Sequence, residues 1–182
     1  MKLAARAELP PWPVPDRDHI EGPIDAPITL LEYGDYECPY CGEAYPVIKA
    51  IQKQLGNRLC FAFRNFPLSN AHPHALHAAA AAEAAGAQGR FWEMHNLLYH
   101  NQSALEDEDL ARYAARLEIN PERLMREVMS DAHVLRIRED FRSGARNGVN
   151  GTPSLFINGV LYEADIQVEE VLAALTRKLP EP

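Results

Sequence analysis

The tetrapeptide Cys38-Pro39-Tyr40-Cys41 constrains this chain of 182 residues more than any other feature of its sequence. Two cysteines that are separated by two residues at the start of a helix can form and exchange a disulfide. Residues 28–33 are mostly apolar and predict a strand, and residues 41–55 carry apolar side chains at helical spacing. This order of strand, cysteine pair and helix indicates a redox site rather than a chance pair.

The composition restricts the classes of protein to which the chain can belong. Its hydrophobic content of 47% is ordinary for a globular protein and suits one domain with a substantial core. Its formal net charge of -8 argues against a nucleic-acid partner and against attachment to an anionic membrane. We therefore expect protein or small-molecule partners, and a monomer.

No apolar run in the sequence reaches the roughly 18 to 20 residues that a transmembrane helix needs. Residues 1–10 also lack a hydrophobic segment of signal-peptide length. The sequence as written therefore predicts a cytoplasmic location. A periplasmic or secreted location is expected instead if Met1 replaces a removed leader.

The pattern of residues divides the chain into three parts. Residues 1–27 are rich in proline, which predicts an extended arm on the surface of the domain. Residues 28–70 and 148–182 predict the two halves of one α/β core, and residues 71–147 predict an all-helical insertion. The expected strands are 28–33, 58–66, 154–157 and 160–163, and the expected helices are 41–55, 75–87, 90–100, 106–117, 121–146 and 168–179.

Short-range signals predict how these elements connect. The strands 28–33 and 58–66 flank one helix, so we expect them to be parallel. Gly56 predicts the end of that helix. The dipeptide Asn158-Gly159 between two apolar runs predicts a hairpin.

The position of Pro39 predicts how the two cysteines differ. Proline suits the first position of a helix, which makes Cys38 the N-cap and turns the amides of Tyr40 and Cys41 toward its sulfur. These donors and the helix dipole stabilise a thiolate, so Cys38 is the expected nucleophile. Cys41 lies on the apolar face of the helix and is expected to be a buried resolving thiol.

Neighbouring carboxylates and the third cysteine add to this expectation. Asp35, Glu37 and Glu43 flank the pair and disfavour a thiolate, which predicts a milder oxidant than a site with a basic residue between its cysteines. Cys60 lies in an apolar strand and is expected to be a buried, inert core thiol.

Glu32 ends the apolar run that precedes the cysteine pair. If its side chain faces inward beneath the pair, burial raises its pKa and lets it carry the proton of Cys41. If it faces outward, it is a solvated charge at the end of a strand. The residue pattern alone leaves both orientations open.

The chain resembles the DsbA-like family of thioredoxin-fold disulfide oxidoreductases over residues 22–178. The resemblance is carried by the cysteine pair, by Gln88-Gly89-Arg90-Phe91-Trp92 in the helical part, and by Gly151-Thr152-Pro153-Ser154-Leu155-Phe156-Ile157-Asn158-Gly159. It implies an α/β thioredoxin fold with an all-helical subdomain inserted between a strand-helix-strand unit and a hairpin-helix unit.

The same resemblance implies roles for individual residues. Pro153 is expected to be a cis proline packed against the active-site disulfide, and the backbone of Thr152 is expected to pair with an extended substrate segment. Pro39 and Tyr40 are expected at the substrate-binding surface, and Glu32 matches a buried acidic residue of the family. Tyr40 stands where strongly oxidising members have histidine, which leaves the direction of electron flow open.

The sequence therefore predicts a thiol-disulfide oxidoreductase that acts on cysteines of protein substrates or on small thiols. Its disulfide is regenerated by a redox partner protein or by glutathione. The dithiol itself is the redox group, so we expect no metal and no organic cofactor.

Three other functions compete with this prediction. A zinc site could join Cys38 and Cys41 to two of His72, His74 and His77, although structural zinc usually takes two well-spaced ligand pairs. A peptide-binding module could use the Pro153 groove without turnover. A glutathione-dependent transferase or isomerase could use the same fold, although such proteins usually carry a single Ser or Cys.

Overall fold

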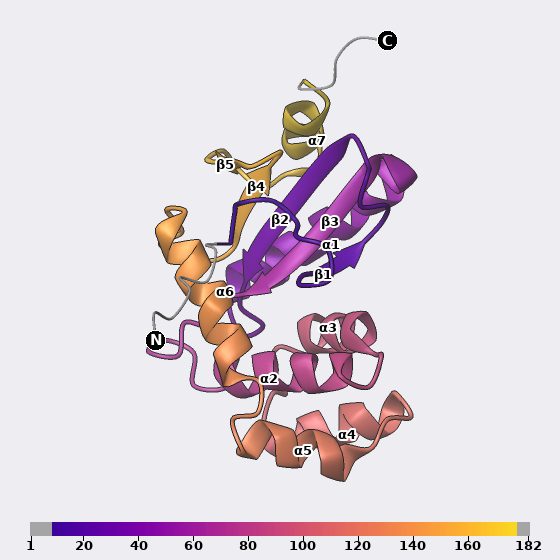
Figure 1. Cartoon of the computed structure of the whole chain (residues 1–182), viewed down its shortest axis with the longest axis vertical. Coiled ribbons are helices and arrows are strands. Elements are labelled where there is room, and N and C mark those ends of the chain that lie inside the picture. Colours follow the sequence, from indigo (N-terminus) through magenta and orange to yellow (C-terminus); the bar gives the residue numbers. More distant parts are fainter. Residues whose placement is uncertain (1–8, 178–182) are drawn as a thin grey trace, which may run out of the picture.

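A computed structural model describes residues 9–177. The first eight residues of the expected arm and the end of the expected closing helix lie outside the described residues. A five-stranded sheet in the order β1-β3-β2-β4-β5 occupies the centre (Figure 1). Its strands are β1 (His19–Glu21), β2 (Ile28–Gly34), β3 (Leu59–Asn65), β4 (Ser154–Ile157) and β5 (Val160–Tyr162). The helices are α1 (Pro39–Leu55), α2 (Ala75–Gly86), α3 (Phe91–His100), α4 (Asp107–Arg116), α5 (Pro121–Met129), α6 (Val134–Arg146) and α7 (Val168–Thr176).

The strand pairings confirm the predicted α/β core. β2 and β3 are parallel, β4 is antiparallel to β2, and β5 forms the predicted hairpin with β4. β1 was not predicted; it comes from the proline-rich arm and pairs antiparallel with β3. Three residues are too few to produce an alternating pattern in the sequence, so only the pairing partner reveals this strand.

Helices cover both faces of the sheet. Leu30 of β2 packs in the core shared with α1 and α7, whereas Leu31 and Tyr33 pack in a second core on the opposite face. α6 lies on that opposite face, where Ser143 and the Tyr33 hydroxyl are 2.7 Å apart. Figure 1 shows α2 to α5 gathered below the sheet, at the carboxyl ends of β2 and β3. The insertion therefore adjoins the end of the sheet at which α1 begins.

The prediction of a single helix over residues 121–146 is wrong. The structure has two helices there, α5 and α6, and Asp131 between them adopts a left-handed φ of 55°. A residue with positive φ cannot continue a right-handed helix. Because buried residues recur on both sides of the turn (Leu124, Val128 and Ile137), the apolar spacing does not show the break.

Arg64 of β3 fastens the arm to the sheet. Its Nε and Nη2 donate to the Asp18 carboxylate at 3.0 and 2.7 Å. Its Nη1 donates to the Pro10 carbonyl and the Tyr33 hydroxyl, and Nη2 also donates to the Trp12 carbonyl. All five guanidinium donors thus have acceptors, which allows a fully buried arginine.

Within residues 9–177, no helix combines the length and the apolar character needed to cross a bilayer.

Replacing Arg64 with methionine should destabilise the protein strongly. The change leaves the buried Asp18 carboxylate with Arg17 as its remaining cationic partner and releases the arm from the sheet. We expect the free energy of unfolding, measured in urea, to fall by about 3 kcal/mol. Arg112→Met, which removes an exposed pair with Asp109, should cost less than about 1 kcal/mol. Equal midpoints for Arg64→Met and the unmodified protein would contradict this account.

Candidate active site

The cysteine pair lies at the start of α1, as predicted. Cys38 is the N-cap in an extended conformation (φ −68°, ψ 121°), and Pro39 begins the helix. The exposed fractions are 3% for Cys38 and 0% for Cys41. Pro39 and Tyr40 are exposed beside them, and Tyr40 reaches 67%. Both thiols are free, so the structure represents the dithiol form.

The two thiols have opposite pKa shifts. The pKa of Cys38 falls from 9.0 to about 5, chiefly because Cys41 hydrogen-bonds to its sulfur; burial opposes this, and Thr152 and the amides of Cys41 and Tyr40 assist it. Burial raises the pKa of Cys41 well above 9.0, and the hydrogen bond to Cys38 and the charge of Glu32 raise it further. At neutral pH, Cys38 is therefore a thiolate and Cys41 a thiol.

A cis peptide bond joins Thr152 to Pro153, as the resemblance implied. The Cys38 thiol donates to the Thr152 carbonyl oxygen at 3.4 Å, across 114 residues of sequence. The buried Thr152 hydroxyl has no hydrogen-bond partner among the described residues. It is therefore available to donate to Cys38 when that sulfur is a thiolate.

Glu32 faces inward, on the side of the sheet that α1 covers. Its exposed fraction is 2%, and its Oε1 has no hydrogen-bond partner among the described residues. Burial raises its pKa from 4.5 to about 8; Lys49 lowers this pKa, and the charge of Cys38 raises it. The inward orientation is thus the one found, and the solvated alternative is wrong.

Tyr99 of α3 is a site residue that the sequence did not reveal. Gly34 separates it from Glu32: a Cβ on residue 34 would lie 2.7 Å from the Tyr99 hydroxyl oxygen and 3.0 Å from Glu32 Oε1. Only glycine allows these two groups to approach the strand so closely. The Tyr99 hydroxyl also lacks a partner among the described residues, so both polar atoms converge unpaired beneath the cysteine pair.

Gln102 holds the loop that presents the nucleophile. Its Nε2 donates to the carbonyl oxygens of Tyr36 and Cys38 at 2.9 and 2.8 Å. Gln102 follows α3, so the helical insertion directly supports the N-cap of α1. No local pattern around Gln102 distinguishes it from a surface residue, because its role depends on a contact more than sixty residues away.

Two of the three acidic neighbours of the cysteines contact histidines. Asp35 and Glu37 are paired with the imidazoles of His72 and His74, whereas Glu43 is exposed. The strongly lowered pKa of Cys38 shows that a thiolate forms readily despite these carboxylates. The prediction of a milder oxidant, which compares this site with one that has a basic residue between its cysteines, stays a prediction.

His72, His74 and His77 lie beside carboxylates, and Cys60 lies in the core. Among residues 9–177, no three His, Cys, Asp or Glu side chains group so as to hold a metal ion. His72, His74 and His77 each contact a carboxylate instead. Cys60 is fully buried in β3, as predicted, and burial raises its pKa.

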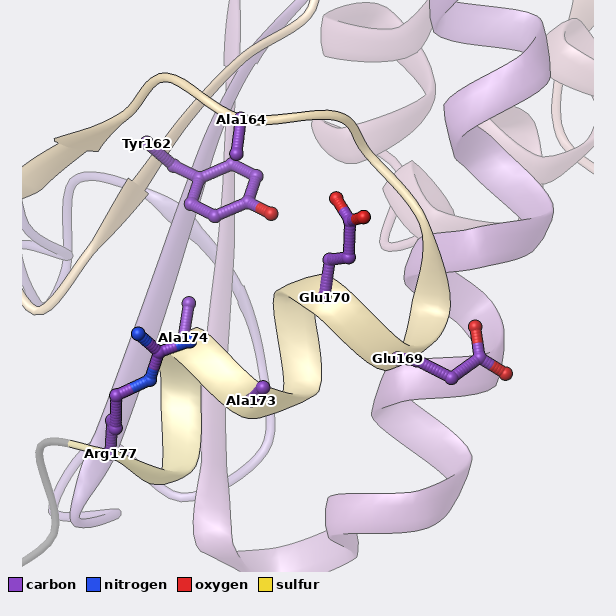
Figure 2. Close-up of a pocket in the computed structure, with 7 residues that line it drawn as sticks. All are labelled: Tyr162, Ala164, Glu169, Glu170, Ala173, Ala174 and Arg177. Carbon is purple, nitrogen blue, oxygen red and sulfur yellow. The ribbon is translucent and has the colours of Figure 1, made fainter.

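A cavity of about 790 Å³ lies away from the cysteine pair, between the end of the hairpin and α7. Figure 2 shows Tyr162 and Ala164 on the hairpin side, facing the side chains of Glu170 and Ala174 on α7. None of the sequence-predicted site residues lines this cavity.

Comparison with known proteins agrees with this geometry. A family model described as thioredoxin matches residues 15–177. Oxidised BdbD from Bacillus subtilis superposes with a TM-score of 0.83 at 22% identity, over 93% of this chain and 97% of that chain. Alpha-DsbA1 from Wolbachia pipientis gives a TM-score of 0.77 at 19% identity, over 91% and 92%. At these identities the structural likeness establishes the fold.

Curated relatives are more similar in sequence but much longer. The chain is 43% identical over 162 residues to a Salinispora arenicola protein named Na(+)/H(+) antiporter NhaA 1, covering 89% of this chain and 25% of that protein. A Mycolicibacterium vanbaalenii protein of the same name is 40% identical over 163 residues, covering 88% and 26%. The chain thus spans about a quarter of the length of these relatives.

Replacing Glu32 with glutamine should stabilise the reduced protein at neutral pH. The folded pKa of about 8 exceeds the ordinary 4.5, so the folded state holds the extra proton between these values and the contribution of Glu32 to stability falls as pH rises through them. We expect Glu32→Gln to gain roughly 1 to 3 kcal/mol at pH 7 and to lose this fall. Urea unfolding of the reduced protein from pH 4 to 9 measures it.

The exposed carboxylate Glu43 provides the matched control. Glu43→Gln should leave the pH dependence of unfolding unchanged, since this side chain is exposed. If the difference in free energy of unfolding between Glu32→Gln and the unmodified protein does not grow as pH rises from 5 to 8, the assignment is refuted.

Proposed function

Because the chain belongs to the thioredoxin family, we propose that it is a DsbA-like thiol-disulfide oxidoreductase that exchanges disulfides with cysteines of protein substrates. One arrangement carries this proposal: Cys38 is the N-cap of α1, Cys41 is buried one turn later, and their pKa values are shifted in opposite directions. A reactive thiolate beside a protected thiol is the combination that a two-step exchange requires.

The exchange proceeds through a mixed disulfide. The Cys38 thiolate attacks one sulfur of a substrate disulfide, forming a bond to it and releasing the other sulfur as a thiolate. Cys41 then loses its proton and attacks Cys38 Sγ, which forms the Cys38–Cys41 disulfide and releases the reduced substrate. Run in reverse, the same steps oxidise a substrate dithiol.

Glu32 accepts the proton that Cys41 loses. A general base works best when its pKa lies near the working pH, and the pKa of Glu32 is about 8. Its charge also acts on Cys41 and raises the pKa of that thiol. As the Cys38 thiolate is consumed in the mixed disulfide, the repulsion between its charge and Glu32 disappears, which favours an ionised Glu32 at the moment when Cys41 must be deprotonated.

The substrate lies across the cis peptide bond. The Thr152 carbonyl contacts the nucleophile, so an extended peptide that pairs with the backbone at Thr152 would align its cysteine with Cys38. Pro39 and the exposed ring of Tyr40 form the other side of this surface. A redox partner protein or glutathione then restores the starting state.

Two other activities fit the observations less well. A non-catalytic peptide-binding module and a single-thiol transferase or isomerase need no second cysteine with a raised pKa, yet Cys41 is held in that state. The antiporter names belong to much longer proteins, and this chain matches about a quarter of their length. The residues of the matched part support thiol exchange. A cytoplasmic location stays a prediction, because it depended on residues 1–10.

Substitution of the cysteines tests the proposed function. Cys38→Ser should reduce insulin disulfides no faster than the uncatalysed reaction, because the attacking thiolate is missing. Cys41→Ser should accumulate mixed disulfides with substrate, visible by mass spectrometry, because no resolving thiol remains. Cys60→Ser, which changes a buried thiol outside the site, should keep the unmodified rate. Insulin reduction at the unmodified rate by Cys38→Ser would refute the proposal.

A further inference from the structure

Asp35 connects to both cysteines through its own backbone. Its amide donates to Cys41 Sγ at 3.5 Å, and its carbonyl oxygen accepts the amide of Cys38 at 3.2 Å. The side chain of Asp35 is fully buried in the same place. A desolvated carboxylate beside a thiolate is unfavourable unless a positive charge compensates it.

His72 is the cation that the structure supplies. Its Nδ1 lies 2.8 Å from Asp35 Oδ2, and the remaining acceptor positions of Asp35 take the amides of Glu37 and Leu68 at 2.8 Å each. Among the described ion pairs, His72 is the only partner of Asp35. The His72 side chain is 18% exposed, so it can exchange a proton with solvent.

A second pair of the same kind lies beside the first. His74 Nδ1 is 2.9 Å from Glu37 Oε1, and the His74 amide donates to Glu37 Oε2 at 2.6 Å. Both histidines belong to the loop that precedes α2, and both carboxylates belong to the loop that precedes α1. Two imidazole-carboxylate contacts therefore join these loops at the mouth of the site.

The charges that face His72 are those of Asp35, Glu37 and Cys38. Burial lowers the pKa of His72, but the hydrogen bond to Asp35 and these three charges raise it above its ordinary value. An interaction between two titrating groups is mutual, so a protonated His72 favours the Cys38 thiolate. This contribution adds to those of Cys41, Thr152 and the amides of Cys41 and Tyr40, which are the larger ones at Cys38.

We propose that His72, held in place by Asp35, is a positioning residue that supplies the positive charge facing the Cys38 thiolate. The proposal deepens the proposed function and rests on it, because it says how the reactivity of that nucleophile is set. Protonated His72 stabilises the reduced form of the site. As pH rises and the imidazolium is lost, that stabilisation disappears and the site becomes a weaker oxidant.

Charge substitution at position 72 tests the proposal. In His72→Gln, the pH midpoint for formation of the Cys38 thiolate, followed by absorbance at 240 nm, should rise above that of the unmodified protein. Alkylation of Cys38 by iodoacetamide at pH 5 should slow, because a smaller fraction of Cys38 is then a thiolate. His72→Lys, which keeps a permanent charge, should keep the low midpoint.

The control is His77→Gln. His77 pairs with Asp107 and both side chains are more than 40% exposed, at 42% and 45%, so the midpoint for Cys38 should not change. The glutathione equilibrium provides a second readout. In the unmodified protein it should show a pH step from His72, and His72→Lys should lack that step.

An unchanged midpoint in His72→Gln overturns the proposal, and so does a raised midpoint in His72→Lys. If His72→Gln does not fold, His72→Lys decides the question. A low midpoint for the Cys38 thiolate, together with a glutathione equilibrium that lacks the pH step, supports the proposal. A glutathione equilibrium that keeps the step refutes it. Alkylation needs no disulfide substrate and no turnover. If the unmodified protein does not reduce insulin, the proposed function is refuted. The pH midpoint of Cys38 can still be measured in that case, so the two failures are distinguishable.

Discussion

The hydrogen bond from the Cys41 thiol to the Cys38 sulfur is the interaction on which the rest of the site depends. It makes the largest contribution to the low pKa of Cys38, and it raises the pKa of Cys41. The contact requires Cys38 at the N-cap and Cys41 on the buried face of α1, one turn later. A single helix start thereby produces two thiols of unequal reactivity, which is what sequential attack and resolution need.

The helical insertion completes this site rather than merely accompanying it. Gln102 binds the carbonyl oxygens before and at the N-cap, Tyr99 lies beside Glu32 across Gly34, and His72 pairs with Asp35. All three residues belong to the segment between β3 and β4. The cysteine pair therefore lies at a junction of the sheet and the insertion, and both layers contribute to its electrostatics.

Whether the sequence predicts a feature of this site depends on how far apart in the sequence the contacting residues lie. The cysteine pair, Pro39 and the buried face of α1 are local, so spacing predicted them correctly. The orientation of Glu32 stayed open because all residues of β2 are buried except Thr29, so no alternation shows which face each side chain joins. Tyr99 and Gln102 act through contacts with distant segments, and no local pattern marks them. The histidine cluster did mark His72, but as a candidate zinc ligand, because its partner Asp35 lies in a distant segment. The break at Asp131 was missed because buried residues continue on both sides.

Buried carboxylates elsewhere in the molecule show why Glu32 is different. Glu83 of α2 is also buried, but His19 and Asn65 hydrogen-bond to it and Arg136 lies 2.6 Å away, so its pKa is lowered despite burial. That cluster joins the arm, the sheet and α6 through a fixed negative charge. Glu32 has an oxygen without a partner, and its pKa rises to about 8. A buried carboxyl group with an unpaired oxygen contributes no fixed charge to the fold. It can gain or lose its proton when the charge on Cys38 changes.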